Sequence, residues 1–148
     1  MPYDLTRFKR AQERDYETAL TEIRTGAKQS HWMWYIFPQI KGLGFSEVAD
    51  YYGLDGVDEA SAYLADDLLR SRLVEISESL LSLESNDPGQ VLGYPDDLKL
   101  RSSMTIFLVA AEQLRRYEKA AQVFQAVLDK FFDGKKDDKT LSMCFRFQ

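Results

Sequence analysis

An apolar stretch inside a helical pattern constrains this chain most. Residues 104–111 read "MTIFLVAA" and are apolar at every position except Thr105. A helix that is apolar around most of its circumference is buried on most sides. The longest purely apolar run, Ile106 to Ala111, is far shorter than the roughly 18 residues that span a bilayer. The sequence therefore predicts a central buried helix that Asp96 caps and that reaches about Tyr117, and no membrane partner.

The rest of the chain shows apolar residues at the three-and-four spacing of amphipathic helices. We expect a first helix after Asp4 that stops at Gly26, with or without a break at 13–15. Further helices are expected from Ser46 to Gly53, with Asp58 as a cap, from Asp67 to Leu83, at 123–132 and at 140–145. Residues 84–97, "ESNDPGQVLGYPDD", consist of turn formers. No strand pairing is expected. The pattern predicts an all-α fold, an irregular orthogonal array of about six to eight helices, in a single domain of residues 1–148.

Composition limits the class of protein. The chain has 148 residues, 45% of them hydrophobic, which suits one core. Its net charge is −5, and the basic residues alternate with acidic ones, so we expect no nucleic acid partner. The amino terminus lacks the apolar core of a signal peptide, and the single cysteine cannot form an intrachain disulfide. A cytoplasmic location follows as an expectation.

Motifs of known chemistry are missing from the sequence. With one histidine and one cysteine, a zinc site would need several carboxylates at unmarked spacing, and we expect no metal. The glycines form no phosphate loop or dinucleotide-binding fingerprint, so no cofactor is expected. Cys144 lies in "LSMCFRF" without a catalytic motif, which is typical of an inert buried thiol. His31 is the only candidate catalytic residue, and the reaction stays unassigned.

The first candidate site is aromatic. Residues 30–41, "SHWMWYIFPQIK", contain the only histidine and both tryptophans of the chain. Such clusters usually fill cores, but a short aromatic segment that ends at a proline is also typical of pocket walls. We favour a pocket formed by His31, Trp32, Trp34, Phe37 and Gln39. Two alternatives stay open: His31 as a core residue, and Gln39 as a group that closes the loop backbone.

The second candidate site is polar. The segment "DDLKLRSSMT", residues 96–105, places the donors Lys99, Arg101, Ser102 and Ser103 in the first turns of the buried helix. Free backbone N–H groups and the helix dipole also favour an anion there. Lys99 and Arg101 are two residues apart and point to different sides, so they can serve different groups. In the alternative, Arg101 pairs on the surface with Asp97, four residues before it, and the hydroxyls of the segment bond back to helical carbonyls.

Three stretches carry a family resemblance: "SHWMWYIFPQIKGLG", "AYLADDLLRSRL" and "DDLKLRSSMTIF". They resemble the bacterial family called domain of unknown function 1810, which is loosely labelled calpastatin-like. The resemblance covers most of the chain. It implies a small all-helical domain, and it brings no established activity, substrate or catalytic residue.

Together these features predict a binding site. The best hypothesis is an uncharacterised domain that binds a small anionic, partly aromatic, nucleotide-like ligand in a pocket between His31–Gln39 and Lys99–Thr105. Its tryptophans would stack a ring and its polar cluster would hold the charge. The alternative is a non-enzymatic helical protein-interaction adaptor, since Trp, Tyr and Arg are enriched at interface hot spots. Either a monomer or a homodimer fits the sequence.

Overall fold

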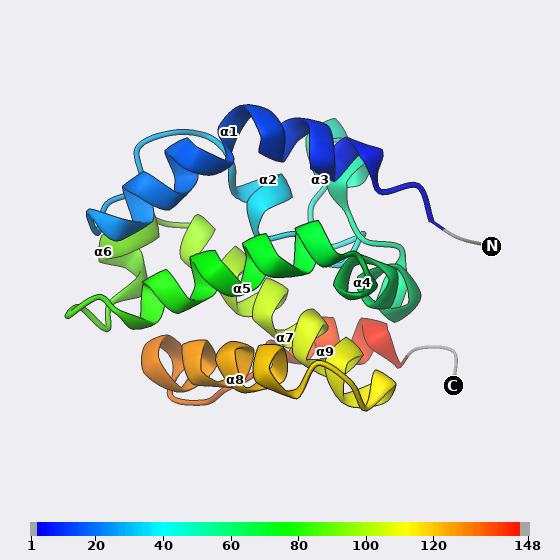
Figure 1. The fold of residues 1–148 in the computed structure, drawn as a ribbon. Helices are drawn as coiled ribbons and strands as arrows, with labels where there is room; N and C mark the ends of the chain where they lie inside the picture. The colour runs from blue at the N-terminus through cyan, green and yellow to red at the C-terminus, as the bar shows by residue number, and fades with distance from the viewer. Residues whose placement is uncertain (1–2, 146–148) are drawn as a thin grey trace.

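The computed structural model describes residues 3–145, which form nine α-helices and no sheet (Figure 1). The helices are α1 (Thr6–Arg24), α2 (Met33–Ile36), α3 (Glu47–Tyr52), α4 (Gly56–Ala65), α5 (Asp67–Leu81), α6 (Pro88–Leu92), α7 (Asp96–Leu114), α8 (Glu118–Phe132) and α9 (Asp138–Cys144). The all-α class is confirmed. In the described range there is one helix more than the upper end of the expected number, because α2 and α6 add to the seven helices expected by position. Helix α6 lies in a segment that was expected to be turns.

Local capping explains where several of these helices begin. The side chain of Ser46 accepts a hydrogen bond from the Ala49 N–H at 3.1 Å, so the predicted start of α3 is confirmed. The carboxylate of Asp87 accepts from the N–H groups of Gly89 and Gln90, and Pro88 occupies the first position of α6. A proline there costs no intrahelical hydrogen bond. Turn-forming residues therefore start a helix in this segment.

Other predicted helix starts are wrong. The helix expected to be capped by Asp58 begins two residues earlier, at Gly56, so Asp58 lies in its first turn. Asp96 is the first residue of α7 and not its cap, because Pro95 occupies the cap position. Acidic side chains in a first turn still interact favourably with the helix dipole, which is why the sequence pattern does not separate the two positions. Helix α1 runs without a break from Thr6 to Arg24.

Helix α7 is central, as predicted. Every residue from Ser102 to Ala111 is buried, and α7 packs against α4, α6, α8 and α9. Phe107 contacts the ring of Tyr63 on α4 at 5.0 Å between centroids and that of Phe124 on α8 at 6.0 Å. Figure 1 shows α1, α5 and α8 stacked on one another, with α7 passing behind α5. The buried hydrophobic side chains form one cluster.

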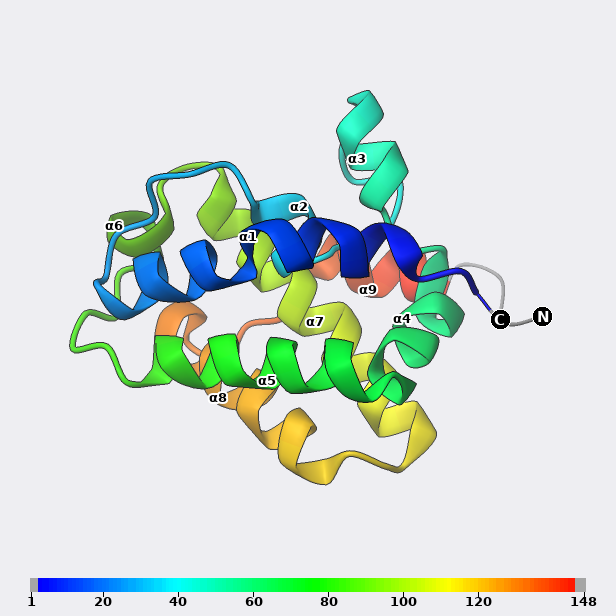
Figure 2. The ribbon, with the colours of Figure 1, turned by 45° about the horizontal axis from the view of Figure 1, so that its top comes forward.

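Helix α3 departs from this packed body. Figure 2 shows α3 projecting from the rest of the molecule. The chain enters and leaves this excursion at an isolated parallel bridge between Ile40 and Leu54. There the Lys41 N–H donates to the Leu54 carbonyl at 2.8 Å, and the Leu54 N–H donates to the Gln39 carbonyl at 2.9 Å. Residues 41–53 therefore leave the body and return to it at one closed base.

Candidate functional site

Most of the aromatic stretch belongs to the core. Trp32 and Phe37, both predicted to contact a ligand, are each only 1% exposed, and their ring centroids lie 6.3 Å apart. The helical part of the stretch is the single turn of α2, whose Met33, Tyr35 and Ile36 are buried. The core-filling alternative therefore describes these side chains. Trp34 is the tryptophan that solvent reaches, since it is half-buried.

Glu22 fixes the loop that leads into this stretch. Its carboxylate accepts hydrogen bonds from the N–H groups of Gln29 and Ser30, from the Ser30 hydroxyl, and from Nε1 of Trp32 at 2.9 Å. The indole N–H thus has a partner inside the protein. Burial alone would raise the pKa of Glu22, but the hydrogen bonds from Ser30, Gln29 and Trp32 outweigh it and lower the pKa to about 2. The Glu22 carboxylate therefore stays charged while it holds the loop.

Of the two polar residues of this stretch, His31 is exposed and Gln39 is buried. His31 is exposed, so the alternative of a core histidine is wrong. Gln39 is 8% exposed, and its carbonyl accepts the Leu54 N–H that closes the base of the α3 excursion. The backbone of Gln39 closes the loop, as one of the two alternatives proposed.

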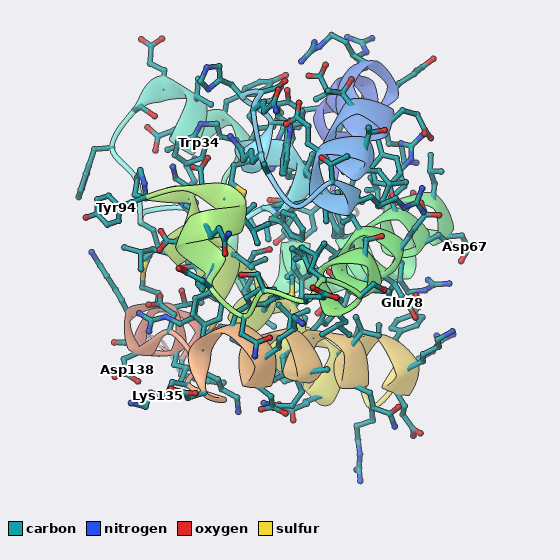
Figure 3. All side chains as sticks on the ribbon, turned by 90° about the vertical axis from the view of Figure 1, so that its left-hand side faces the viewer. Trp34, Asp67, Glu78, Tyr94, Lys135 and Asp138 are labelled. Atoms are coloured by element: carbon teal, nitrogen blue, oxygen red, sulfur yellow. The ribbon has the colours of Figure 1, made fainter. Side chains whose placement is uncertain are left out.

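Trp34 and Lys99 bring the two predicted segments together. Nζ of Lys99 lies 4.4 Å from the centroid of the Trp34 ring, within the range of a cation–π contact. A Cβ added to Gly44 would lie 3.5 Å from Cη2 of Trp34, so the segment before α3 borders the same ring. Figure 3 shows Trp34 next to that segment and Tyr94 in the same region of this face. The aromatic and polar segments therefore meet at the surface.

A carboxylate balances the positive charge beside these rings. Asp96 accepts hydrogen bonds from Nζ of Lys28 at 2.8 Å and from Nζ of Lys99 at 2.9 Å. Lys28 also lies over the Trp32 ring, 5.1 Å from its centroid. Burial would raise the pKa of Asp96, but the hydrogen bonds from Lys28 and Lys99 hold it below its usual range. We call Lys28, Trp34, Asp96 and Lys99 the Trp34–Lys99 surface.

Arg101 and Ser102 of the polar segment hold a carboxylate of the protein itself. Asp137, just before α9, accepts from the Ser102 hydroxyl at 3.3 Å, from the Thr140 N–H at 3.0 Å and from the Thr140 hydroxyl at 2.5 Å. The Arg101 guanidinium pairs with it at 3.6 Å, so the alternative is wrong in its choice of Asp97 as the partner. The predicted anion seat is thus occupied by the start of α9. Sequence reasoning did not include Asp137 or Lys28, which lie far from the segment along the chain.

The other hydroxyls of this segment follow the alternative interpretation. The Ser102 hydroxyl also donates to the Leu98 carbonyl at 3.3 Å, and the Thr105 hydroxyl donates to the Arg101 carbonyl at 2.8 Å. Both are bonds to the preceding helical turn. Ser103 is fully buried, and its hydroxyl has no hydrogen-bond partner among the described residues. Ser103 therefore lies inside the core and away from the surface where a ligand would bind.

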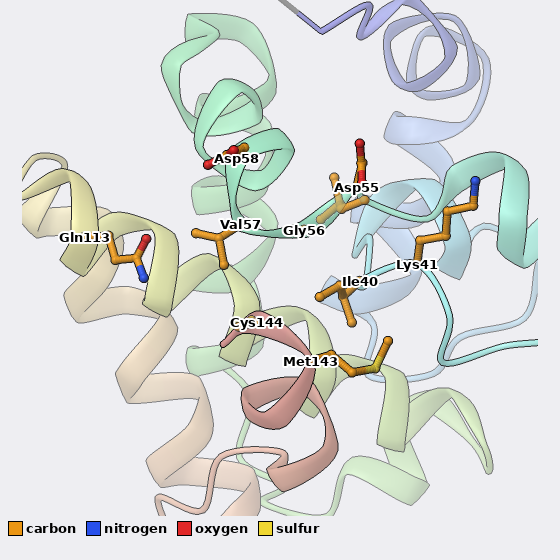
Figure 4. Close-up of a pocket in the computed structure, with 10 residues that line it drawn as sticks. Ile40, Lys41, Asp55, Gly56, Val57, Asp58, Gln113, Met143 and Cys144 are labelled. Atoms are coloured by element: carbon orange, nitrogen blue, oxygen red, sulfur yellow. The ribbon is translucent and has the colours of Figure 1, made fainter. Parts of the chain in front are cut away.

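Cys144 lines a separate hollow of about 440 Å³ at the base of the α3 excursion (Figure 4). Its charged and polar lining includes Lys41, Asp55, Asp58 and Gln113. Burial raises the pKa of the Cys144 thiol, and a thiol with a raised pKa is a poor nucleophile. His31 does not line this hollow, so the geometry gives no support to a Cys144–His31 pair.

Residues 3–145 contain neither a metal-binding cluster nor a helix that could cross a membrane. In this range, no group of three or more His, Cys, Asp or Glu side chains is arranged to hold a metal ion. None of the helices described there combines the length and the apolar character needed to cross a membrane.

Comparison with known proteins gives the family. The family described as "Protein of unknown function (DUF1810)" matches residues 2–144. The conserved hypothetical protein Rv1873 from Mycobacterium tuberculosis, known from a crystal structure, is 41% identical; the match covers 97% of each chain with a TM-score of 0.89. A search of curated proteins found no match. The chain therefore belongs to the DUF1810 family of proteins of unknown function.

Proposed function

We propose that this protein binds a small anionic ligand that carries an aromatic ring, and that the Trp34–Lys99 surface is the binding site. The observation that supports this best is the 4.4 Å contact between Nζ of Lys99 and the Trp34 ring. It joins a flat apolar group and a cation at a place that solvent reaches. A nucleotide-like ligand combines the two complementary groups, a ring for stacking and a phosphate for the ammonium group.

The local charge is compatible with an anion. Lys28 and Lys99 share the single carboxylate of Asp96, so the three groups together carry one positive charge. An ammonium group has three N–H donors, and Asp96 takes one of those on Lys99. Donors therefore remain for a phosphate oxygen. We assign His31, which is exposed, the role of a further polar contact at the edge of the site.

The proposal is narrower than the sequence prediction. Trp32, Phe37 and Ser103 support the site from within the core, where they are at most 1% exposed. Arg101 and Ser102 hold Asp137 and thereby fix α9 against α7. Direct contact with the ligand is thus proposed for Trp34, Lys99 and His31.

A thermal-shift panel of nucleotides, dinucleotides and sugar phosphates tests the proposal. A ligand at a hundred times its dissociation constant stabilises the folded state by about 2.7 kcal/mol, which raises the melting temperature. We expect at least one compound to raise the melting temperature of the wild type. Lys99→Gln removes the charge and keeps a polar side chain that is one atom shorter, so it should lose most of that shift, measured against its own ligand-free melting temperature.

Lys119→Gln is the matched control, because Lys119 is an exposed lysine at the start of α8, away from this surface. It should keep the full shift. The proposal is wrong if no compound shifts the wild type, or if Lys99→Gln responds to the same compounds as strongly as the wild type does.

A further inference from the structure

Helix α3 presents an apolar outer face that no described residue covers. Phe45, directly before the helix, is 92% exposed, and Val48 and Tyr51 are 44% and 59% exposed. Val48 and Tyr51 are three residues apart and share one side of the helix. Single exposed apolar residues are ordinary, but neighbouring ones on a projecting element mark interaction surfaces. We call Phe45, Val48 and Tyr51 the α3 face.

The inner side of the same helix is firmly attached. The Tyr52 ring lies 5.0 Å from that of Tyr35 and 6.1 Å from that of Phe8, and Ala49 is buried. Nε of Arg7 donates to the Tyr51 carbonyl at 2.7 Å, and its Nη2 donates to the Gly53 carbonyl at 3.1 Å. Helix α3 is therefore held in a fixed position. Its exposed side chains form a preorganised surface, which reduces the entropic cost of binding.

An ion pair beneath the helix strengthens this attachment. Nη1 of Arg7 lies 3.0 Å from the carboxylate of Glu59, which is 3% exposed as a residue. The Glu59 carboxylate also accepts the Asp55 N–H at 2.7 Å. Both charges are thereby satisfied within the protein. They are not left to bind a partner.

The protein surface beside the α3 face is acidic. A hollow of about 790 Å³ lies next to it, and Tyr51 belongs to both. Five carboxylates line the hollow. Glu59 pairs with Arg7, and the other four form no ion pair with any residue from 3 to 145: Asp4, Glu47, Asp50 and Asp55. Lys41 is the one cation of the lining that Glu59 does not neutralise. The balance of Lys41 and these four carboxylates is strongly negative.

We propose that the α3 face and its acidic hollow dock a basic amphipathic segment of another protein. Apolar side chains of the segment would cover Phe45, Val48 and Tyr51, and its Lys or Arg side chains would enter the hollow. Charge complementarity selects this occupant, because opposite charges across an interface speed association and fix orientation. A second copy of this face would bring like charges together. The α3 face and its hollow share no residue with the Trp34–Lys99 surface, so each proposal can be disproved alone.

Fluorescence anisotropy with a defined probe tests this docking. The probe is a short fluorescein-labelled peptide of leucine and lysine at helical spacing, and a second peptide carries glutamate in place of each lysine. The wild type should bind the lysine peptide and not the glutamate peptide. The double variant Phe45→Ser/Tyr51→Ser should weaken binding at least about tenfold, since truncated aromatic anchors carry much of an interface's affinity.

A second double variant tests the role of the carboxylates in the hollow. Glu47→Gln/Asp50→Asn should weaken binding and reduce its dependence on salt, because screened charge attraction is what salt removes. Tyr94→Ser is the control for the aromatic residues, since Tyr94 is 80% exposed and lies outside α3. It should bind as the wild type does. Far-UV circular dichroism checks that each variant is folded.

Several results would overturn the proposal. If the two peptides bind equally, charge complementarity does not select the partner. If Tyr94→Ser weakens binding as much as Phe45→Ser/Tyr51→Ser does, the docking surface is not the α3 face. If both double variants bind the lysine peptide as the wild type does, neither the carboxylates nor the aromatic residues of this surface take part in binding. A concentration-dependent dimer of the free wild type that Phe45→Ser/Tyr51→Ser dissociates would identify a second copy of the chain as the occupant and contradict the proposed partner.

Discussion

Glu22 shows how one side chain can fix a loop that has no secondary structure. Its carboxylate accepts from two backbone N–H groups, a hydroxyl and an indole between residues 29 and 32. A carboxylate that accepts several N–H and O–H bonds is stabilised in its charged form. The same bonds keep Trp32 in the core and so place its neighbour Trp34 at the surface.

The Glu22 contacts predict a pH-dependent stability. The pKa of Glu22 in the folded state is lowered to about 2 from its ordinary value of 4.5. The stabilisation is therefore present above about pH 4.5 and is lost as the pH falls towards 2. Glu22→Gln should lower the free energy of unfolding near neutral pH by about 1 kcal/mol, and by less as the pH falls through this range.

Urea unfolding at a series of pH values from neutral to acidic measures this effect. Glu17→Gln is the matched control, because Glu17 is exposed on the same helix. A constant difference between Glu22→Gln and the wild type across the acidic range would contradict the assigned role of Glu22.

At the scale of elements, α9 is held by polar contacts with α7. The Asp137 carboxylate caps α9 through the Thr140 N–H and is bound from α7 by Ser102 and Arg101. The Asp137 N–H in turn donates to the Thr105 hydroxyl at 2.9 Å. The polar residues at the start of α7 therefore dock another helix.

Asp137→Ala should release α9 from α7. Loss of the cap costs about 0.5–2 kcal/mol, and the variant also leaves Arg101 and Ser102 without their partner. We expect faster amide hydrogen exchange in residues 138–145 and little change in α1. Asp138→Ala, at the exposed first position of α9, is the control. Equal exchange in the two variants would show that Asp137 does not hold the helix.

Element positions were more predictable from the sequence than the contacts of the polar segment. Three-and-four spacing is a local property, so it located α1, α5, α7 and α8 within a few residues. The pairing of Arg101 and Ser102 with Asp137 joins residues that lie 36 and 35 positions apart. Sequence alone shows that Asp137 can cap a helix, but it does not show which distant donors meet it. The helix positions could therefore be predicted from the sequence, and the tertiary contacts of Arg101 and Ser102 could not.

At the scale of the whole molecule, one core joins the helices. Phe107 of α7 is fully buried, and its ring contacts Tyr63 of α4 and Phe124 of α8. Both halves of the sequence contribute to this contact. Because the buried side chains form a single cluster, the helices should unfold together.

Phe107→Ala should therefore destabilise the molecule as a unit. Removing a fully buried phenylalanine costs about 3–5 kcal/mol, and urea unfolding measured by far-UV circular dichroism and by tryptophan fluorescence should shift by the same amount. Phe45→Ala, at a residue that is 92% exposed, should change the free energy of unfolding by less than about 0.5 kcal/mol. Separate transitions for the two signals would contradict a single cooperative core.

The sequence also left undecided which side chains face solvent. The "SHWMWYIF" stretch supplies an exposed His31, a buried Trp32 and a half-buried Trp34, and nothing in the order of its letters separates them. Their positions depend on Glu22, Lys28 and Lys99, which come from three other segments. Rare residues in one stretch therefore indicated a place in the molecule and not the role of each residue.

Because Asp137 already binds Arg101 and Ser102, a dissolved anion would have to compete with its carboxylate for them. A group tethered beside its own binding site acts at an effective concentration of about millimolar or above. Free phosphate or a nucleotide would have to exceed that local concentration before it displaced Asp137 from Arg101 and Ser102. The junction of α7 and α9 is thus protected from the dissolved anions around it, and the protein can keep Arg101 and Ser102 in the first turns of α7 without binding such anions at these two residues.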